Sequence, residues 1–263
     1  MSALEHALLK GDCRHTAGSF RDGVFDLIYV DPPFCSGRRQ RLLTGPGFDD
    51  RWPGDLEGYL AWLIPRAREM RRVLAPTGSI FFHLDWHAVH ASKVALDEVF
   101  GRSLFINEII WSYRTGGTSG RWLARKHDTL LFYARSKAYK FHPLRERSAL
   151  AHRYGFANAA VQHDDDGPYR MTLMRDVWDI PALRGNSRER VSFPTQKPLA
   201  LLERIIDLVT DPGDRVGDFL CGSGTALVAA LRRGRRAYGG DLSDAALALT
   251  RTRIEQLRPD TQA

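Results

Sequence analysis

Cysteine is scarce in this sequence, and long apolar runs are absent. The 263 residues include three cysteines, Cys13, Cys35 and Cys221, which are widely separated. An odd number at these spacings argues against a disulfide framework and a paired CxxC metal site, so we expect reduced thiols and no metal. No stretch approaches the roughly 20 apolar residues that span a membrane, and the first residues lack a signal-peptide pattern. We therefore expect a cytoplasmic location and no membrane partner.

Acidic residues are scarce in one window of the chain. Between Trp111 and Lys140 there are seven basic residues and one acid, Asp128. A second basic cluster, SGRRQR, lies at 36–41, and the formal net charge is +7. Such clusters are typical either of contacts with the phosphates of a polyanion or of a solvated surface that keeps the chain soluble. The side chains that we assign to phosphate contact are Arg38, Arg39, Arg41, Arg114, Arg121, Arg125 and Lys126.

The order of apolar patterns predicts an α/β fold with a mainly parallel, doubly wound sheet. Strand-like runs alternate with runs of helical spacing in both the first and the last third of the chain, so helices should cover both faces. Two strand-like runs, INEIIWSYR and HDTLLFYAR, are separated by a glycine-rich loop and predict a hairpin. Strands are expected at 25–30, 78–84, 214–220 and 235–243, and helices at 56–74, 87–100, 197–209, 223–234 and after Ser243.

The middle of the chain, residues 141–190, shows no sustained period of either kind. We expect a small irregular insertion there, between residues 1–140 and 191–263, which form two halves of one domain. Eight arginines and seven acids nearly cancel in this segment. Because its charge is balanced, any sequence readout should come from a few side chains that reach base edges, and we name Arg184, Asn186 and Arg188.

A glycine turn, Gly222-Ser223-Gly224, follows a predicted strand near the carboxyl end. Glycines there permit a tight turn and a close approach of the backbone to a ligand. Leu227 occupies the sixth position of a G-x-G-x-x-G pattern, which weakens a pyrophosphate site. Asp241 ends the next strand, 17 residues beyond Gly224, near the spacing of an acid that binds ribose. The pattern favours S-adenosylmethionine, and the alternatives are a simple turn and a helix N-cap at Asp241.

The stretch IYVDPPFCSG, residues 28–37, ends a strand in an acid, two prolines and an aromatic. Each proline fixes its φ and lacks an N–H, so the loop is stiff and its carbonyls are free to accept hydrogen bonds. Asp31 and the Pro32 carbonyl suit the two hydrogens of a nucleobase amine, and Phe34 suits stacking on a base that has been flipped out of a duplex. The alternative is a plain turn. If the strands that end at Asp31 and Asp218 are central neighbours, the amine and cofactor sites face each other.

Four segments, DPPF, FPTQKPLALLERII, GDFLCGSGTALVAA and YGGDLS, together resemble the amino-methylating DNA methyltransferases of the permuted beta class. In that class the DPP(Y/F) motif comes first, a target-recognition region follows and the cofactor loop comes last. The chain has this order over nearly its whole length, with further matches at LLKGDCRH, NEIIWSY, KHDTLLFY and VWDIP. The resemblance implies a circularly permuted Rossmann-like methyltransferase fold, S-adenosylmethionine as cofactor and double-stranded DNA as partner.

The resemblance also assigns roles to individual residues. Asp241 is expected to bind the ribose and Asp12 to lie near the adenine of the cofactor. Thr195 and Lys197 are expected at the methionine end, where the Lys197 ammonium pairs with the cofactor's carboxylate. The remaining assignments are Asp31, Pro32, Pro33 and Phe34 for the target base, and Asp218, Phe219, Gly222, Ser223, Gly224 and Thr225 for the cofactor loop.

Two positions depart from the family pattern. The chain reads Asp218-Phe219-Leu220 where the family usually reads Asp-Pro-Phe, and Phe34 replaces the commoner Tyr. The second change leaves adenine and cytosine open as targets. Members with an acidic DPP motif are most often adenine-specific, so we expect site-specific methylation of adenine N6, with cytosine N4 as the alternative. Residues 35–52 are expected to form a mobile loop over the site that becomes ordered on DNA.

Other functions are compatible with parts of the pattern. Methyltransferases that act on RNA or on a protein amide use the same amine chemistry, but they generally place the cofactor loop first and have Asn in place of Asp31. A DNA-binding module that has lost catalysis is a third hypothesis, supported by the displaced Phe219. The family leaves open a homodimer and a restriction endonuclease partner.

Overall fold

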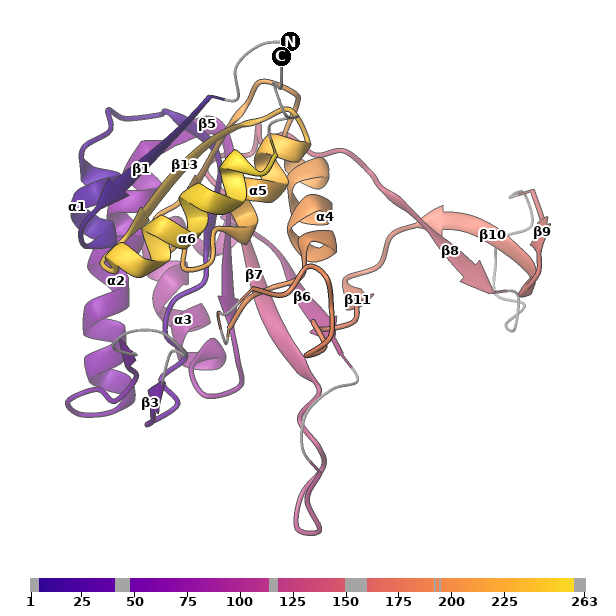
Figure 1. Cartoon of the computed structure of the whole chain (residues 1–263), viewed down its shortest axis with the longest axis horizontal. Helices are drawn as coiled ribbons and strands as arrows, with labels where there is room; N and C mark the ends of the chain where they lie inside the picture. Colours follow the sequence, from indigo (N-terminus) through magenta and orange to yellow (C-terminus); the bar gives the residue numbers. More distant parts are fainter. Residues whose placement is uncertain are drawn as a thin grey trace.

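A central sheet with the strand order β1-β13-β12-β2-β5-β7-β6-β11 organises the protein (Figure 1). The computed structural model describes residues 5–40, 48–113, 118–149, 160–191, 193 and 195–257. The first five strands of this order pair in parallel, and the β6–β7 hairpin is antiparallel, as predicted. The strands span His6–Lys10 (β1), Arg236–Asp241 (β13), Arg215–Asp218 (β12), Phe25–Val30 (β2), Leu74–Leu84 (β5), His127–Ala134 (β7), Phe105–Ser112 (β6) and Val177–Asp179 (β11).

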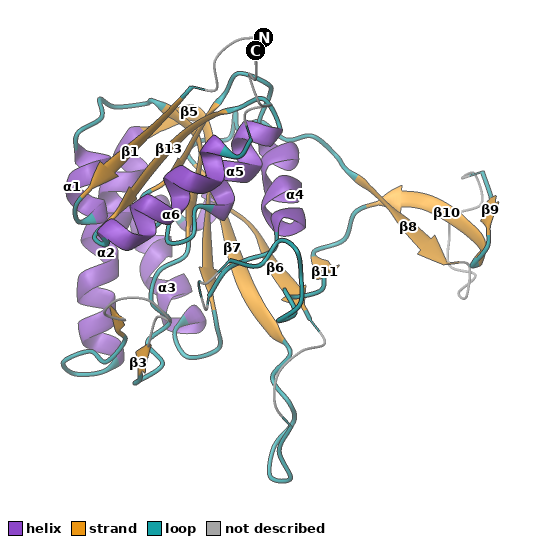
Figure 2. Cartoon of the chain, viewed as in Figure 1, coloured by secondary structure: helices purple, strands orange, loops and turns teal. Residues whose placement is uncertain are grey.

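Helices cover both faces of this sheet, which confirms the doubly wound α/β class (Figure 2). Successive residues of β2 point to opposite faces, because side chains alternate along a strand. Leu27 and Tyr29 pack in the core with α4, α5 and α6, whereas Ile28 and Val30 pack with α1, α2 and α3. No helix in the described ranges is long and apolar enough to cross a bilayer. The helices span Cys13–Gly18 (α1), Leu56–Val73 (α2), Val89–Phe100 (α3), Leu199–Val209 (α4), Thr225–Arg232 (α5) and Asp244–Glu255 (α6), with a 3-10 turn at Arg102–Leu104.

Strands β2 and β12 are neighbours at the centre of the sheet, as the predicted site requires. Leu27 lies opposite Val216 and Ile28 lies opposite Gly217 in a parallel register. The two strands therefore end at the same edge of the sheet, although almost two hundred residues separate them. Their carboxyl ends place Asp31 and Asp218 on one side of the molecule.

The segment 141–190 contains more regular structure than its sequence predicts. Strands β8 (Arg145–Ala149), β10 (Gly167–Leu173) and β9 (Gln162–Asp164) form a small antiparallel sheet that projects from the main body (Figure 1). These strands are short and solvent-exposed or half-buried, so no apolar alternation marks them. Strand β11 then returns to the central sheet beside β6, and Trp178 is buried there. Strand β1 and helix α1 are likewise too short to give a period.

The segment 35–52, which the sequence predicts to be a mobile loop, is held at its ends. Asp50 is 1% exposed and its carboxylate accepts the backbone N–H groups of Cys35 and Ser36 at 2.9 and 2.8 Å. The indole N–H of Trp52 donates to the same carboxylate at 3.1 Å. Strands β3 (Arg39–Gln40) and β4 (Phe48–Asp49) pair between these anchors. Both ends of the segment are therefore fixed to each other beside the DPPF motif, while residues 41–47, on which the predicted mobility also falls, lie outside the described residues.

An aromatic cluster fills the core around strands β2, β12 and β13. Phe219 is 1% exposed, and its ring centroid lies 5.4 Å from that of Phe25 and 5.9 Å from that of Phe20. Tyr238 joins the cluster 5.6 Å from Phe25. Edge-to-face and tilted pairs at these distances are favourable for aromatic rings. Phe219 therefore serves the core rather than a ligand.

We predict that Phe219→Ala lowers the free energy of unfolding by about 3–5 kcal/mol, because it leaves a cavity in a close-packed cluster. Urea denaturation followed by far-UV circular dichroism measures this change. Phe141→Ala is the matched control, since Phe141 is 45% exposed and its removal should cost less than about 1 kcal/mol. Equal losses for the two variants would contradict the assignment of Phe219 to the core.

Candidate functional site

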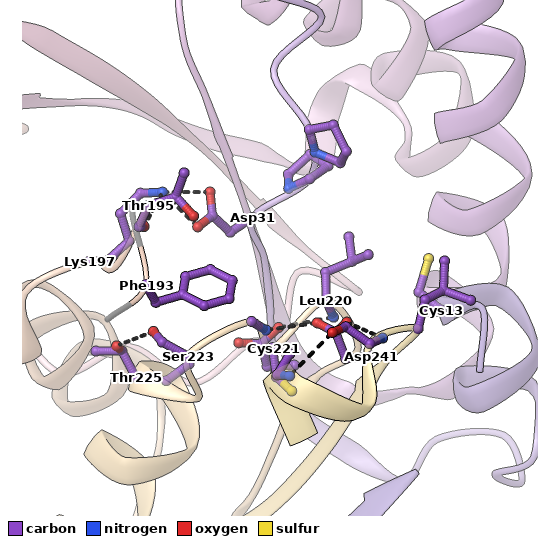
Figure 3. A pocket seen from close by; sticks show the side chains of 18 of the residues that line it. Cys13, Asp31, Phe193, Thr195, Lys197, Leu220, Cys221, Ser223, Thr225 and Asp241 are labelled. Carbon is purple, nitrogen blue, oxygen red and sulfur yellow. Dashed lines mark hydrogen bonds and ion pairs between the residues drawn. The ribbon is translucent and has the colours of Figure 1, made fainter. Parts of the chain in front are cut away.

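A cavity of about 940 Å³ opens at the carboxyl ends of β2 and β12 (Figure 3). Asp31 follows β2, Asp218 ends β12, and Asp241 ends β13, and all three carboxylates line this cavity. Ligands of doubly wound sheets bind at this edge, outside the carboxyl ends of the strands. Within the described ranges, no three His, Cys, Asp or Glu side chains are grouped as a metal site would require. The geometry joins the DPPF motif and the glycine turn in one space.

Asp31 is paired with Lys197 inside the cavity. The Lys197 ammonium donates to both carboxylate oxygens, at 2.8 and 2.6 Å, and it lies 5.0 Å from the centroid of the Phe34 ring. The Lys197 and Asp31 side chains are 9% and 20% exposed, so water screens this pair only weakly. Figure 3 shows the Lys197 side chain reaching across the cavity toward Asp31. The sequence assigns this ammonium to a cofactor carboxylate, whereas in the structure it holds the carboxylate of the DPPF motif.

Phe34 rests on a buried polar network. Its ring stacks on the imidazole of His83 with centroids 5.9 Å apart, and His83 is fully buried. The Nδ1 atom of His83 lies 2.7 Å from the Tyr29 hydroxyl, and Nε2 lies 3.1 Å from the carboxylate of Asp128. Burial raises the pKa of Asp128, but His83, the charge of Lys197 and the Tyr113 hydroxyl together outweigh this effect and lower the pKa overall. Three neighbouring strands, β2, β5 and β7, thus fix the floor below Phe34.

The glycine turn folds tightly around Asp241. The N–H of Gly222 donates to one carboxylate oxygen at 2.9 Å, and the N–H of Ser243 donates to the other at 2.8 Å. Gly222 has φ +50° and Gly224 has φ +74°, and a Cβ on Gly224 would lie 2.5 Å from Thr250. Both positions therefore require glycine. Burial raises the pKa of Asp241, and Ser243, not Asp241, caps helix α6.

Asp218 is a buried carboxyl at the back of the cavity. It is 3% exposed and accepts the backbone N–H of Leu220 at 3.2 Å. Burial and the nearby charges of Asp31 and Asp241 raise the pKa of Asp218 well above its usual range. A carboxyl in this environment gains most from a cation supplied by a ligand. Asp218 is thus suited to an ammonium group.

Asp12 and Cys13 form the opposite wall. The Asp12 carboxylate accepts the N–H of Arg14 at 2.8 Å, which caps helix α1, and the guanidinium of Arg66 at 2.5 Å. Burial raises the pKa of the Cys13 thiol to about 12, so the thiol is neutral. In Figure 3, Cys13 and Leu220 lie on the Asp241 side of the cavity, away from Asp31. This end of the cavity therefore combines an apolar surface with acceptor groups.

Twelve of the fourteen residues predicted to contact the target base or the cofactor line the cavity, and Phe219 and Gly224 are the exceptions. Phe219 is part of the aromatic core, and Gly224 begins helix α5 with its Cα packed on Thr250. Leu220 lines the cavity at the sequence position where the family usually has Phe. The aromatic residue of this chain, Phe219, is one position earlier and points into the core instead. The residues that do line it are Asp12, Asp31, Pro32, Pro33, Phe34, Thr195, Lys197, Asp218, Gly222, Ser223, Thr225 and Asp241.

The described basic residues among those assigned to phosphate contact lie outside the cavity, on the surface around it. They occupy three places: the β3 segment, the β6–β7 connection and the exposed stretch 181–191. Arg41 and Arg114 fall outside the described residues. The others are Arg38 and Arg39 at β3, Arg121, Arg125 and Lys126 on the connection, and Arg184 and Arg188 in the exposed stretch.

Several cavity residues were missed by sequence reasoning. Phe193 precedes the TQKP segment, and its ring would lie 3.1 Å from a Cβ on Gly222, so it closes one side of the glycine turn. Figure 3 shows this ring between Asp31 and Ser223. Its place in the quoted FPTQKP match was an available signal. Asp50 and Trp52 also line the cavity, but only closure of the 35–52 segment brings them there.

We predict that Asp218→Asn stabilises the ligand-free protein at neutral pH. The raised pKa of Asp218 means that its contribution to stability is present below about pH 4, the usual range of an Asp, and is lost as pH rises through the raised value. Asparagine removes this loss, so the free energy of unfolding at pH 7 should be higher for the variant than for the wild type.

Urea denaturation at several pH values checks this expectation. The gain should shrink as pH falls toward 4, because the wild-type carboxyl is then protonated as well. Asp22→Asn is the control, since that side chain is 78% exposed and its substitution should change little. A gain that is independent of pH, or a loss at pH 7, would contradict the argument.

Similarity to known proteins agrees with the geometry. The family model described as DNA methylase, of N6 and N4 type, matches residues 25–251. The DNA adenine methyltransferase YhdJ from Escherichia coli K12 is 29% identical over 229 residues, which cover 83% of this chain and 72% of that protein. The chain spans 65% and 72% of the length of two curated relatives that it matches.

Solved structures show the same fold. The PvuII DNA methyltransferase, described as cytosine-N4-specific, has a TM-score of 0.69 at 16% identity and covers 98% of this chain and 88% of its own. TTHA0409 of Thermus thermophilus, described as a DNA modification methylase and solved with S-adenosyl-L-methionine, has a TM-score of 0.64 at 23% identity. The match covers 97% of this chain and 95% of that chain. The family match runs from β2 into α6 and includes the strand ends and the turn that form the cavity. The chain therefore belongs to the N6/N4 DNA methylase family.

Proposed function

We propose that this protein transfers a methyl group from S-adenosylmethionine to the N6 amino group of a specific adenine in double-stranded DNA. The observation that carries the proposal is the shared cavity: the DPPF motif opens onto the same space as the glycine turn and Asp241. Family membership supports DNA as the substrate class. Adjacent sites for cofactor and target amine are what a direct transfer between two bound molecules needs.

The residues present fit S-adenosylmethionine by their chemistry. The Asp241 carboxylate suits the ribose hydroxyls, and buried Asp218 suits the cofactor's ammonium group. The hydroxyls of Ser223 and Thr225, at the start of helix α5, suit its carboxylate. Leu220 and neighbouring apolar side chains provide a surface for the adenine ring. When bound, this cofactor supplies a methyl group that a sulfonium already activates.

The chain's own contribution is to hold the target amine and make its lone pair available. Asp31 and the Pro32 carbonyl accept hydrogen bonds from the two amine hydrogens, which favours a pyramidal nitrogen. A carboxylate has about four lone-pair sites, so Asp31 has room for the amine beside the Lys197 ammonium. After transfer, Asp31 is placed to take the proton that the methylated nitrogen loses. Phe34, held on His83, stacks on the flipped base.

Adenine is the proposed base because the DPPF motif resembles adenine enzymes and the similar YhdJ is described as a DNA adenine methyltransferase. Cytosine N4 is the competing target, since the PvuII enzyme has the same fold. The two amines differ in the ring that carries them, whereas Asp31 and Pro32 contact the amine alone. The base must therefore be decided by the reaction product.

We further propose that the segment 141–190 recognises the DNA sequence. Its small sheet, β8-β10-β9, projects from the main body and leaves its edges and faces available to a duplex (Figure 1). Arg184 and Arg188 are exposed in the stretch that leads back to the cavity, after β11. They are therefore candidates for base contacts next to the target rather than on the projecting sheet.

The proposed reaction is tested with labelled S-adenosylmethionine and unmethylated genomic DNA. Nucleoside analysis of the product should give N6-methyladenine, and Asp31→Ala should lower the rate at least about hundredfold, because it removes a preorganised acceptor at the reacting nitrogen. Asp22→Ala is the control. N4-methylcytosine would replace the proposed base, and label in RNA or protein would replace the substrate. Bound cofactor without transfer to any DNA would refute the reaction and favour a DNA-binding module.

We predict that Lys197→Met lowers the methylation rate about tenfold or more but leaves the dissociation constant for the cofactor within about twofold. The Asp31 carboxylate then loses its only charged hydrogen-bond donor observed in the described site, and partners of buried charges matter strongly. Lys93→Met, which breaks an ion pair with Asp97 on helix α3, is the matched control. A large loss of cofactor affinity with an unchanged rate would return Lys197 to the methionine carboxylate.

A further inference from the structure

An exposed apolar patch lies beside the cavity and on the connection between β6 and β7. It consists of Trp86, Trp122 and Leu123, which are 42%, 59% and 92% exposed. Large apolar side chains that gather at such exposures commonly mark a binding surface. Trp122 and Leu123 belong to the connection that extends away from the sheet (Figure 1), so they reach beyond the body of the protein.

Arg125 ties this patch to the rim of the cavity. Its guanidinium carbon lies 3.6 Å from the centroid of the Trp86 ring and 5.9 Å from that of Trp122, which are cation–π distances. Trp86 follows Asp85, and Asp85 lines the cavity. The patch therefore begins next to the place where the DPPF motif would receive a base.

The surroundings of the patch are basic. Arg121, Arg125 and Lys126 lie on the same connection. Asp128, the one acid between residues 111 and 140, is 8% exposed and its carboxylate is bonded to His83 and Tyr113. Asp128 is therefore turned toward the interior, and the exposed side chains of Arg121 and Arg125 give the connection a positive surface. Two copies of this chain would bring like charges together across such a patch, whereas DNA offers apolar base faces between phosphates.

We propose that Trp122 and Leu123 form a wedge that enters the base stack and fills the space left by the flipped target base. The inference rests on the proposed function. Extrusion of a base costs unstacking free energy, and an apolar side chain in the vacated position offsets part of that cost. Arg121, Arg125 and Lys126 contact the phosphates on either side, and the Arg125–Trp86 contact sets the wedge at a fixed place relative to the cavity.

The test is a Trp122→Ala/Leu123→Ala double variant with unmethylated genomic duplex DNA and labelled S-adenosylmethionine. The single-turnover rate should fall about tenfold or more, the scale expected when part of the flipping cost is no longer offset. The dissociation constants for DNA and cofactor should stay within about twofold, and the dependence of DNA affinity on salt should not change, because no cation is removed. Trp122→Phe/Leu123→Met, which keeps apolar volume, should restore at least half of the rate.

Val94→Ala is the matched control, since Val94 is an aliphatic residue 67% exposed on helix α3. A fully active double variant refutes the wedge but not the proposed function. Weaker DNA binding with a smaller salt dependence assigns the connection to phosphate contact only and also refutes it. A sedimentation coefficient that differs between the double variant and the wild type in the absence of DNA assigns the patch to self-association. This outcome also refutes the wedge. A wild-type protein that methylates no DNA refutes the proposed function itself.

Discussion

The parallel pairing of β2 with β12 is the constraint on which the rest of the site depends. Backbone hydrogen bonds between these central strands fix Val216 opposite Leu27, and both strands then end at one edge of the sheet. The DPPF loop follows the carboxyl end of β2, and the glycine turn follows the carboxyl end of β12, at the same edge. A shift of register by one residue would turn every side chain of β2 to the wrong face and separate the two loops.

Negative charge dominates the cavity that this pairing creates. Asp31, Asp218 and Asp241 all line it, and Lys197 is the cation that its described lining includes. Burial of two of these carboxyls is unfavourable for the empty protein, as the raised pKa values of Asp218 and Asp241 indicate. A ligand that brings an ammonium group, a sulfonium and hydroxyl donors relieves this cost. Under the proposed function, the same burial that lowers the stability of the empty fold favours binding of a cationic cofactor.

The surface around the cavity has the opposite sign. Arginines and a lysine lie on the β6–β7 connection and at β3, while the acid in the first window is buried beneath Phe34. Asp128 thus orders the floor below Phe34 through His83 and, by its burial, adds little negative charge to the surface. One residue therefore links the network beneath the DPPF motif with the surface charge that the proposed function assigns to DNA contact.

The sequence by itself determined the α/β class, the order of the two motifs and twelve of the residues that line the cavity. Apolar periods identify strands such as β2 and helices such as α4 because burial enforces those periods, and the DPPF and glycine turns require residues that few other structures need. The projecting sheet β8-β10-β9 escaped prediction, since its short exposed strands bury too little to pattern the sequence. Tertiary structure alone decided that Lys197 pairs with Asp31, that Phe219 belongs to the core and that Asp50 closes the segment after the motif. Each of these contacts joins residues whose relative positions depend on how distant strands pair and pack, and no local pattern encodes them.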